Sequence, residues 1–215
     1  MGQHGGMSEH PGAAAARAEI QRFFSERAAR WENRFPDDDP AYAAAVGELG
    51  LRPGDRVLDA GCGTGRALPP LRAAVGPTGV VLGADLTAAM LHEAAGKGRN
   101  RAARLLLADA EALPVASGAL DAVFAAGLLS HLTDAAHALA ELARVVRPGG
   151  RLALFHPLGR AALAAQHGRR LTEDDLRARP RLAPLLDAAG WRLDSYTDEE
   201  KRYLVLATRR PGARA

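Results

Sequence analysis

The feature that most constrains the fold is a glycine-rich turn at residues 59–65, which reads DAGCGTG. It follows an apolar run at 56–60 and precedes a segment with helical spacing at 66–75. Glycines let the backbone approach a ligand closely, and a helix N-terminus favours negative charge such as a carboxylate. The pattern therefore predicts a binding site at the C-terminal end of the first strand, near the topological switch point of an open sheet.

Strands and helices alternate beyond this turn. Apolar runs typical of strands lie at 56–60, 80–84, 105–108, 119–125, 151–155, 191–196 and 202–207, with helical spacing at 66–75, 87–95 and 134–146. Alternation of this kind predicts crossover connections and a mostly parallel sheet. The last two runs are joined by a short acidic turn and must be antiparallel to each other. We therefore expect an α/β fold in which a seven-stranded sheet has one antiparallel strand and helices on both faces.

The length of 215 residues suits one sizeable domain with short extensions. We interpret residues 1–12 as a disordered tail, and the amphipathic spacing within 13–50 as an N-terminal helical cap. Residues 51–210 would form the binding domain. Within it, the stretch 157–184 is rich in arginine and histidine, and we interpret it as a lid-like insertion.

Composition narrows the classes of partner. Lys and Arg number 28 and Asp and Glu 25, an excess too small to argue for nucleic acid. The single cysteine, Cys62, can form neither an internal disulfide nor a cysteine-rich zinc site, and it fits a cytoplasmic setting. No run approaches the roughly 18 apolar residues of a membrane span. We expect no metal, nucleic-acid or membrane partner.

Acids follow the second and third predicted strands. Asp85 ends the second strand, where a carboxylate can accept hydrogen bonds from two ribose hydroxyls. Asp109 and Ala110 follow the third strand, where an adenine edge would lie. The carboxyl ends of parallel strands share one edge of a sheet, so these positions favour a ligand that contains a nucleoside.

Five motifs carry a family resemblance: the glycine turn, GADL at 83–86, DAEALP at 109–114, ALDAV at 119–123 and RVVRPGGRL at 144–152. In this order and spacing they resemble class I S-adenosylmethionine-dependent methyltransferases, nearest to the quinone-biosynthesis and natural-product branch. The resemblance covers about residues 51–209. It implies a Rossmann-like fold, S-adenosylmethionine as cofactor, and transfer of its methyl group to a small-molecule acceptor, preferably at oxygen.

The resemblance implies roles at the first strand and the fourth. Gly61 and Gly63 would lie against the methionine part of the cofactor, with Cys62 as a small filler between them. Asp59 would lie near the cofactor's amino group, and Ala126 would offer its carbonyl to the same amine. The simpler interpretations are that Asp59 is only a strand-end residue and that the glycines serve helix–strand packing.

Further roles follow for the second and third strands. Asp85 would hold the ribose and Leu86 would pack on the adenine. Asp109 would take the adenine amino group, with the Ala110 backbone beside it. The alternative for Asp85 is a helix cap before Thr87.

Two histidines are candidates for a catalytic base. His131 lies beyond the fourth predicted strand and His156 at the end of the fifth, so both belong at the binding edge. A sulfonium methyl is already activated, so the enzyme mainly orients the reactants and a base is optional. Both histidines would otherwise shape the pocket.

Two groups of side chains could contact the substrate. A basic cluster could hold an acidic substrate group or form a solvated face, and an aromatic group could roof the site or pack the cap onto the body. The basic cluster is His167, Arg169, Arg170, Arg177, Arg179 and Arg181, and the aromatic group is Phe23, Phe24, Trp31 and Phe35.

Three competing functions differ in what the sequence offers them. A nicotinamide-dependent oxidoreductase needs a third glycine where Arg66 stands. An RNA or protein methyltransferase is disfavoured by the modest charge. A non-catalytic or repurposed S-adenosylmethionine-binding protein would keep the same glycine turn. We expect a monomer or homodimer that acts on a small molecule.

Overall fold

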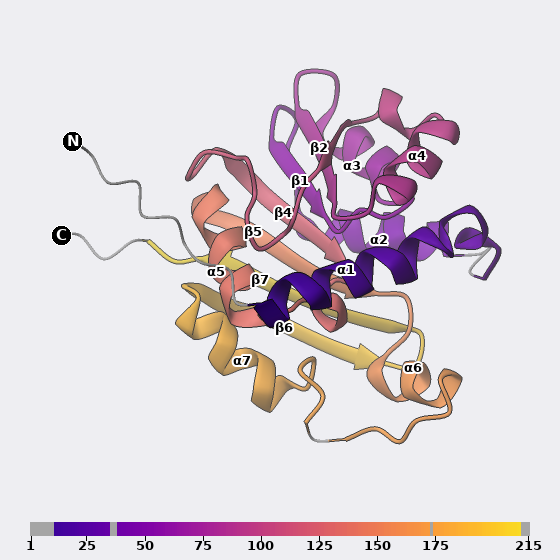
Figure 1. The fold of residues 1–215 in the computed structure, drawn as a ribbon. Coiled ribbons are helices and arrows are strands. Elements are labelled where there is room, and N and C mark those ends of the chain that lie inside the picture. The colour runs from indigo at the N-terminus through magenta and orange to yellow at the C-terminus, as the bar shows by residue number, and fades with distance from the viewer. Residues whose placement is uncertain (1–10, 35–37, 173, 212–215) are drawn as a thin grey trace, which may run out of the picture.

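The computed structural model describes residues 11–34, 38–172 and 174–211 (Figure 1). Its helices are α1 (Pro11–Ser25), α2 (Asp39–Leu49), α3 (Leu68–Val75), α4 (Ala88–Gly96), α5 (Ala135–Val145), α6 (Arg160–Gln166) and α7 (Arg179–Ala188). Its strands are β1 (Arg56–Ala60), β2 (Val80–Asp85), β3 (Arg104–Leu107), β4 (Leu120–Ala126), β5 (Val146–His156), β6 (Trp191–Glu199) and β7 (Arg202–Arg209). Short 3-10 turns are η1 (Ala28–Arg30), η2 (Glu32–Arg34), η3 (Arg99–Arg101) and η4 (Leu129–His131).

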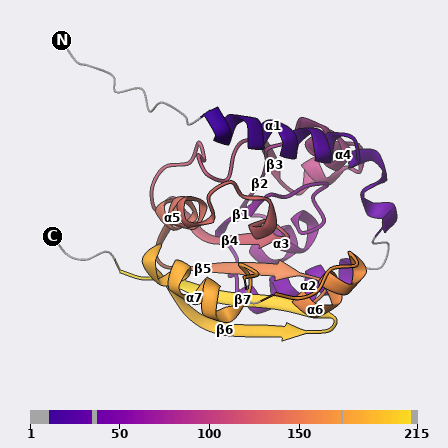
Figure 2. The same ribbon diagram turned by 60° about the horizontal axis from the view of Figure 1, so that its bottom comes forward.

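The described strands form one sheet in the order β3-β2-β1-β4-β5-β7-β6 (Figure 2). β7 runs antiparallel to β5 and to β6, and the other neighbouring pairs are parallel. Val57 of β1 lies beside Val81 of β2 on one side and Ala122 of β4 on the other. The chain steps outward from β1 to β3 and then returns to β4, so the switch point lies between β1 and β4. The predicted fold class, with one antiparallel strand near an edge, is confirmed.

Helices cover both faces of the sheet. On one face, α2 and α3 bury Leu49 and Leu71 against a layer that includes Phe124 of β4. On the other face, α5 and α7 bury Leu139 and Leu186. The central strands are buried on both sides, and this explains why their sequences are continuous apolar runs.

The helix α1 lies apart from these two layers and runs along α4 (Figures 1 and 2). It begins at Pro11, just inside the segment expected to be a tail, because the fixed φ of proline suits the first turn of a helix. It ends at Ser25, and the chain continues through η1 and η2. The remainder of the predicted tail, residues 1–10, lies outside the described residues.

The segment 157–184, interpreted above as a lid-like insertion, contains α6 and the first turns of α7. Gly159 lies just before α6, and its N–H donates to the carbonyl of Glu200 at 3.1 Å. A Cβ at this glycine would overlap the carbonyl oxygen of Glu199. The start of α6 is therefore anchored to the β6–β7 hairpin, and a lid function for the segment stays a prediction.

Across the ranges given above, none of the helices has the length and apolar character needed to cross a membrane. The same ranges bring together no group of three or more His, Cys, Asp or Glu side chains suited to a metal ion.

Candidate functional site

The glycine turn after β1 borders a cavity of about 780 Å³. The N–H of Cys62 donates to the carbonyl of Ala84 at 2.9 Å, which fixes the turn to the end of β2. Gly61 and Gly63 have φ values of 69° and 53°, a region that glycine adopts without steric cost. A Cβ on Gly61 would lie 2.9 Å from Leu128, whereas one on Gly63 would meet no atom within 4 Å. Gly63 therefore leaves free space at the wall of the cavity.

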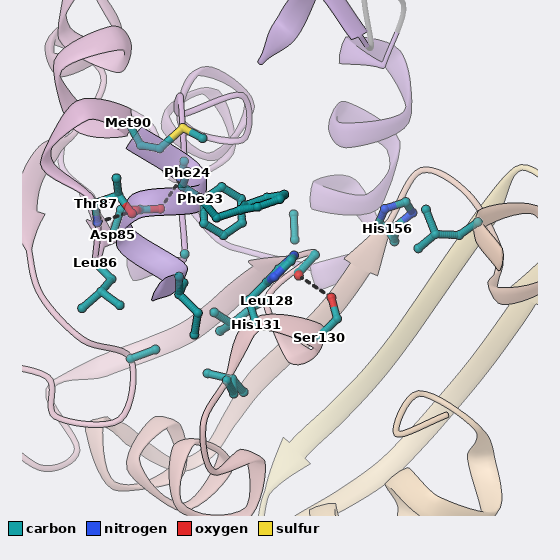
Figure 3. Close-up of a pocket in the computed structure, with 18 of the residues that line it drawn as sticks. Phe23, Phe24, Asp85, Leu86, Thr87, Met90, Leu128, Ser130, His131 and His156 are labelled. Atoms are coloured by element: carbon teal, nitrogen blue, oxygen red, sulfur yellow. Dashed lines mark hydrogen bonds between the residues drawn. The ribbon is translucent and has the colours of Figure 1, made fainter. Parts of the chain in front are cut away.

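The carboxylate of Asp85 closes this turn from the end of β2. Its Oδ2 accepts the N–H of Gly63 at 2.8 Å, and its Oδ1 accepts the N–H of Thr87 at 2.8 Å. Burial raises the pKa of Asp85, and the two backbone hydrogen bonds act in the opposite direction. Figure 3 shows Asp85 with Leu86, Thr87 and Met90 on one side of the cavity.

Asp59 is an acid of β1 buried at the same end of the cavity. Asp59 is 2% exposed, and its Oδ1 has no hydrogen-bond partner among the described residues. Burial, followed by the negative charge of Asp85, raises the pKa of Asp59 to about 8. A buried carboxylate oxygen without a donor is costly, so this atom could accept a hydrogen bond from a donor or cation of a ligand.

The acid after β3 is already partnered with α1. Arg17 pairs its Nε with Oδ2 of Asp109 at 2.7 Å, while Oδ1 of Asp109 accepts the N–H of Glu111 at 2.9 Å. Ala110 is buried between these acids and lines the cavity. Each Asp109 oxygen retains acceptor capacity, so a ligand amino group would share it with the protein.

Glu111 is a structural residue of the site that the sequence interpretation missed. It is 6% exposed and accepts hydrogen bonds from Thr133 N at 2.8 Å, Thr133 Oγ1 at 2.6 Å and Asp134 N at 2.9 Å. Arg17 lies 3.4 Å from its second oxygen. Glu111 therefore joins the loops after β3 and β4 to α1. The sequence signal that could have pointed to Glu111 is its place inside the motif at 109–114. Its partners lie 22 residues or more away in the chain, so they could not be read from that motif.

Glu32 has a similar role at the far end of the cap. Its carboxylate accepts the Thr64 hydroxyl at 2.6 Å and pairs with Arg99 and Lys97. These contacts tie η2 to the glycine turn and to the end of α4. The cap is thus attached by polar groups at both ends.

Aromatic rings of the cap lie over the cavity. Phe24 meets the rings of Phe23 at 5.1 Å, Trp31 at 5.3 Å and His131 at 4.8 Å, each in an edge-on arrangement. The side-chain amide of Gln21 donates to the carbonyl of Leu86 at 3.0 Å, which holds α1 against the end of β2. Phe35, the fourth aromatic residue expected here, lies outside the described residues.

The two candidate bases line the part of the cavity away from Asp85 (Figure 3). Burial, then the charge of Arg177, lowers the pKa of His131. Burial lowers the pKa of His156 to about 4. The Nδ1 of His156 lies 2.9 Å from the carbonyl oxygen of Leu158 and 3.0 Å from the N–H of the same residue. In the tautomer in which Nδ1 donates to the carbonyl, Nε2 keeps its lone pair, whereas in the tautomer in which Nδ1 accepts from the N–H, Nε2 carries the proton.

The structure brings all the sequence-predicted site residues to this one cavity. The cavity is lined by every predicted cofactor-binding residue and by both candidate bases, namely Asp59, Gly61, Cys62, Gly63, Asp85, Leu86, Asp109, Ala110, Ala126, His131 and His156. The predicted basic cluster is divided, because His167, Arg169, Arg170 and Arg177 line the cavity and Arg179 and Arg181 do not.

Residues 58–154 match the family described as "Methyltransferase domain". Over 110 residues the chain is 42% identical to an uncharacterized 37.1 kDa protein in a transposon of Streptomyces fradiae. The matched region covers 51% of this chain and 32% of that protein. Over 128 residues it is 38% identical to a 2-phytyl-1,4-naphtoquinone methyltransferase of Synechocystis, which covers 57% and 54% of the two chains. The chain thus matches about a third to a half of the length of these relatives.

Among solved structures, the fold is similar to a magnesium protoporphyrin IX methyltransferase of Synechocystis with bound S-adenosylhomocysteine. The TM-score is 0.67 at 20% identity, over 90% of this chain and 99% of that one. This likeness concerns the fold.

Proposed function

We propose that this chain, whose residues 58–154 match the methyltransferase-domain family, transfers a methyl group from S-adenosylmethionine to a small-molecule acceptor. The observation that carries the proposal is the buried Asp59, whose Oδ1 has no donor in the part of the chain that the structure describes and which lies beside a glycine turn bonded to Asp85. When bound, the cofactor supplies a sulfonium methyl that is activated towards nucleophilic attack.

The residues around the glycine turn fit the amino-acid end of this cofactor. The ammonium group would satisfy the unpaired oxygen of Asp59, and the carbonyl of Ala126 would add a second acceptor. Gly61, Cys62 and Gly63 would present backbone to the methionine part, since Gly63 leaves open space there. These assignments account for the one buried carboxylate oxygen that lacks a partner among the described residues.

The ends of β2 and β3 fit the nucleoside end. Asp85 would accept hydrogen bonds from the ribose hydroxyls, and Leu86 would pack on the base. Asp109 and the Ala110 backbone would hold the adenine edge, with Arg17 sharing the Asp109 carboxylate. We therefore propose that α1, which carries Arg17, helps to hold the cofactor as well as to cover it.

The protein's contribution to the reaction is binding, orientation and exclusion of water. Phe24 and Trp31 roof the cavity with apolar rings, which lowers the local polarity and strengthens the electrostatic contacts inside. Holding an acceptor in line with the methyl group converts a bimolecular encounter into an effectively unimolecular step, worth up to about 7–11 kcal/mol in favourable cases.

We propose oxygen as the acceptor atom and His156 or His131 as the group that takes its proton. The lowered pKa of each histidine keeps the ring neutral at pH 7, the state in which a ring nitrogen can accept a proton. A cytoplasmic location and a monomeric or homodimeric state stay predictions.

A transfer assay tests the proposal. The protein is incubated with methyl-tritiated S-adenosylmethionine and a panel of phenols, quinols and carboxylic acids, and extracted products are counted. Label in an extractable small molecule, lost in the Asp59→Asn variant, is the expected result. Label only in RNA or protein, or cofactor binding without transfer to any class of acceptor, would contradict it.

A further inference from the structure

Acidic residues at the ends of the parallel strands and arginines after α6 line different parts of the cavity. Asp59, Asp85 and Asp109 line the acidic end, beneath β1, β2 and β3. Arg169 and Arg170 line the basic end, in the segment between α6 and α7. The acidic end is accounted for by the proposed cationic cofactor, and the basic end is not used by that assignment.

Arg177 is a fixed cation at the basic end. Its Nε and Nη2 donate to Oδ1 and Oδ2 of Asp175 at 3.2 and 3.0 Å. Its own carbonyl accepts the hydroxyls of Tyr196 at 2.9 Å and Tyr203 at 3.1 Å. Both the backbone and the side chain of Arg177 are therefore held in place, and the Nη1 edge takes part in no hydrogen bond among the described residues.

Arg177 lines the same cavity as His131 and His156. Its positive charge contributes to the lowered pKa of both histidines. A group bound in this part of the cavity would therefore face Arg177 as well as the two candidate bases. A ligand oxyanion at this point would meet N–H donors that are already oriented.

The excess charge comes from the two neighbouring arginines. Around Arg177, the network it forms with Arg160, Asp175 and Asp198 contains two cations and two anions and is balanced. Arg169 and Arg170 are exposed, and in the described part of the chain neither side chain takes part in an ion pair or hydrogen bond. Two unpaired cations facing a cavity create a positive potential that attracts anions.

We propose that the methyl acceptor is an amphipathic acid, with a carboxylate or phosphate held by Arg177, Arg169 and Arg170 and an apolar body beneath the aromatic cap. This inference rests on the proposed function and specifies its substrate class. The apolar body would lie against Phe24 and Leu163, which line the same cavity. The acceptor end is thus complementary to an anion, as the cofactor end is to a cation.

The experiment compares three probes that share one apolar body: 2-naphthoate, 2-naphthyl phosphate and 2-naphthylmethanol. Each is titrated calorimetrically into the full chain, with and without saturating S-adenosylhomocysteine. The test variants are Arg177→Gln and the double variant Arg169→Ala/Arg170→Ala. The matched control is Arg179→Ala/Arg181→Ala, which removes two cations nearby in the chain but outside the cavity.

The wild type should bind at least one of the two anions about tenfold or more tightly than the alcohol, as expected for charge-assisted hydrogen bonds. In both test variants most of this preference for the anion should be lost, whereas the control variant should keep the wild-type preference. The affinity for S-adenosylhomocysteine should be the same in all the variants as in the wild type. The better of the two anions identifies the acid. Equal affinities, or no binding of any probe, would overturn the inference. Failure of S-adenosylhomocysteine itself to bind would instead contradict the proposed function. The probe titrations without S-adenosylhomocysteine test the acceptor site independently of that result.

Discussion

Asp85 and Gly63 are joined across two strands by a hydrogen bond of 2.8 Å from the glycine N–H to the aspartate Oδ2. This bond holds the glycine turn of β1 in register with the end of β2, so the two segments that border the acidic end of the cavity form one unit. The left-handed conformation of Gly63 and the carboxylate that holds it are therefore parts of the same site.

Gly63→Ala should weaken S-adenosylhomocysteine binding by tenfold or more. The new methyl group would enter the open space beside the turn, and the positive φ would cost roughly 1–2 kcal/mol of stability. Gly98→Ala is the matched control, because Gly98 also has positive φ and open space but does not line the cavity. Calorimetry and urea unfolding would separate the two effects. Equal loss of binding in both variants would show that the effect is conformational only.

The unfolding free energy of the ligand-free protein should fall as pH rises from about 6.5 to about 8, above the range in which the lowered pKa values of His131 and His156 act in the opposite direction. Asp59 has a pKa near 8 in the folded state against 3.8 for an unperturbed group, so the folded state binds a proton that the unfolded state has lost. The raised pKa of Asp85 acts in the same direction. Urea unfolding at several pH values measures this slope, which should become smaller in Asp59→Asn. A slope that is unchanged in the variant would contradict the assignment.

Glu111→Gln should destabilise the protein by roughly 1–3 kcal/mol. The buried carboxylate accepts three hydrogen bonds from the loop after β4 and lies near Arg17, and an amide would place N–H groups against some of these donors. Glu19→Gln, at an exposed position of α1, is a suitable control. Urea unfolding measures the difference, and equal stability of the two variants would contradict the joining role of Glu111.

His156→Asn should lower kcat for an identified acceptor by about 100-fold if the ring takes the acceptor's proton. Because the pKa of His156 is about 4, the wild-type rate should show no loss from protonation of this ring between pH 8 and pH 5.5. S-adenosylhomocysteine affinity should stay unchanged, and His137→Asn on the exposed side of α5 should have wild-type kcat. An unchanged kcat in His156→Asn would remove this residue from the catalytic group.

The fold and the cofactor end of the site were accessible from the sequence for physical reasons. Parallel strands that are buried on both faces have continuous apolar sequences, and β1 lies at 56–60 as predicted. The glycine turn and the acid after each strand have local signatures, since their positions follow from strand ends. The resemblance to methyltransferases is confirmed by the family match at 58–154.

The parts that sequence reasoning missed depend on contacts between distant segments. Glu111 meets Thr133, and Glu32 meets Arg99, 67 residues away. No local pattern encodes such pairs. The division of the basic cluster into a part that lines the cavity and a part on α7 depends on the turn between α6 and α7, which has no periodicity to read.

The most direct test of the central claim is calorimetric titration of S-adenosylhomocysteine into the wild type, Asp85→Asn and Asp121→Asn. Asparagine at 85 must turn its NH₂ toward one of two N–H donors, whereas Asp121 pairs with Arg147 outside the cavity. Binding by the wild type and by Asp121→Asn, with at least tenfold weaker binding by Asp85→Asn, is the predicted result. No binding by the folded wild type, or equal binding by all three proteins, would contradict the account.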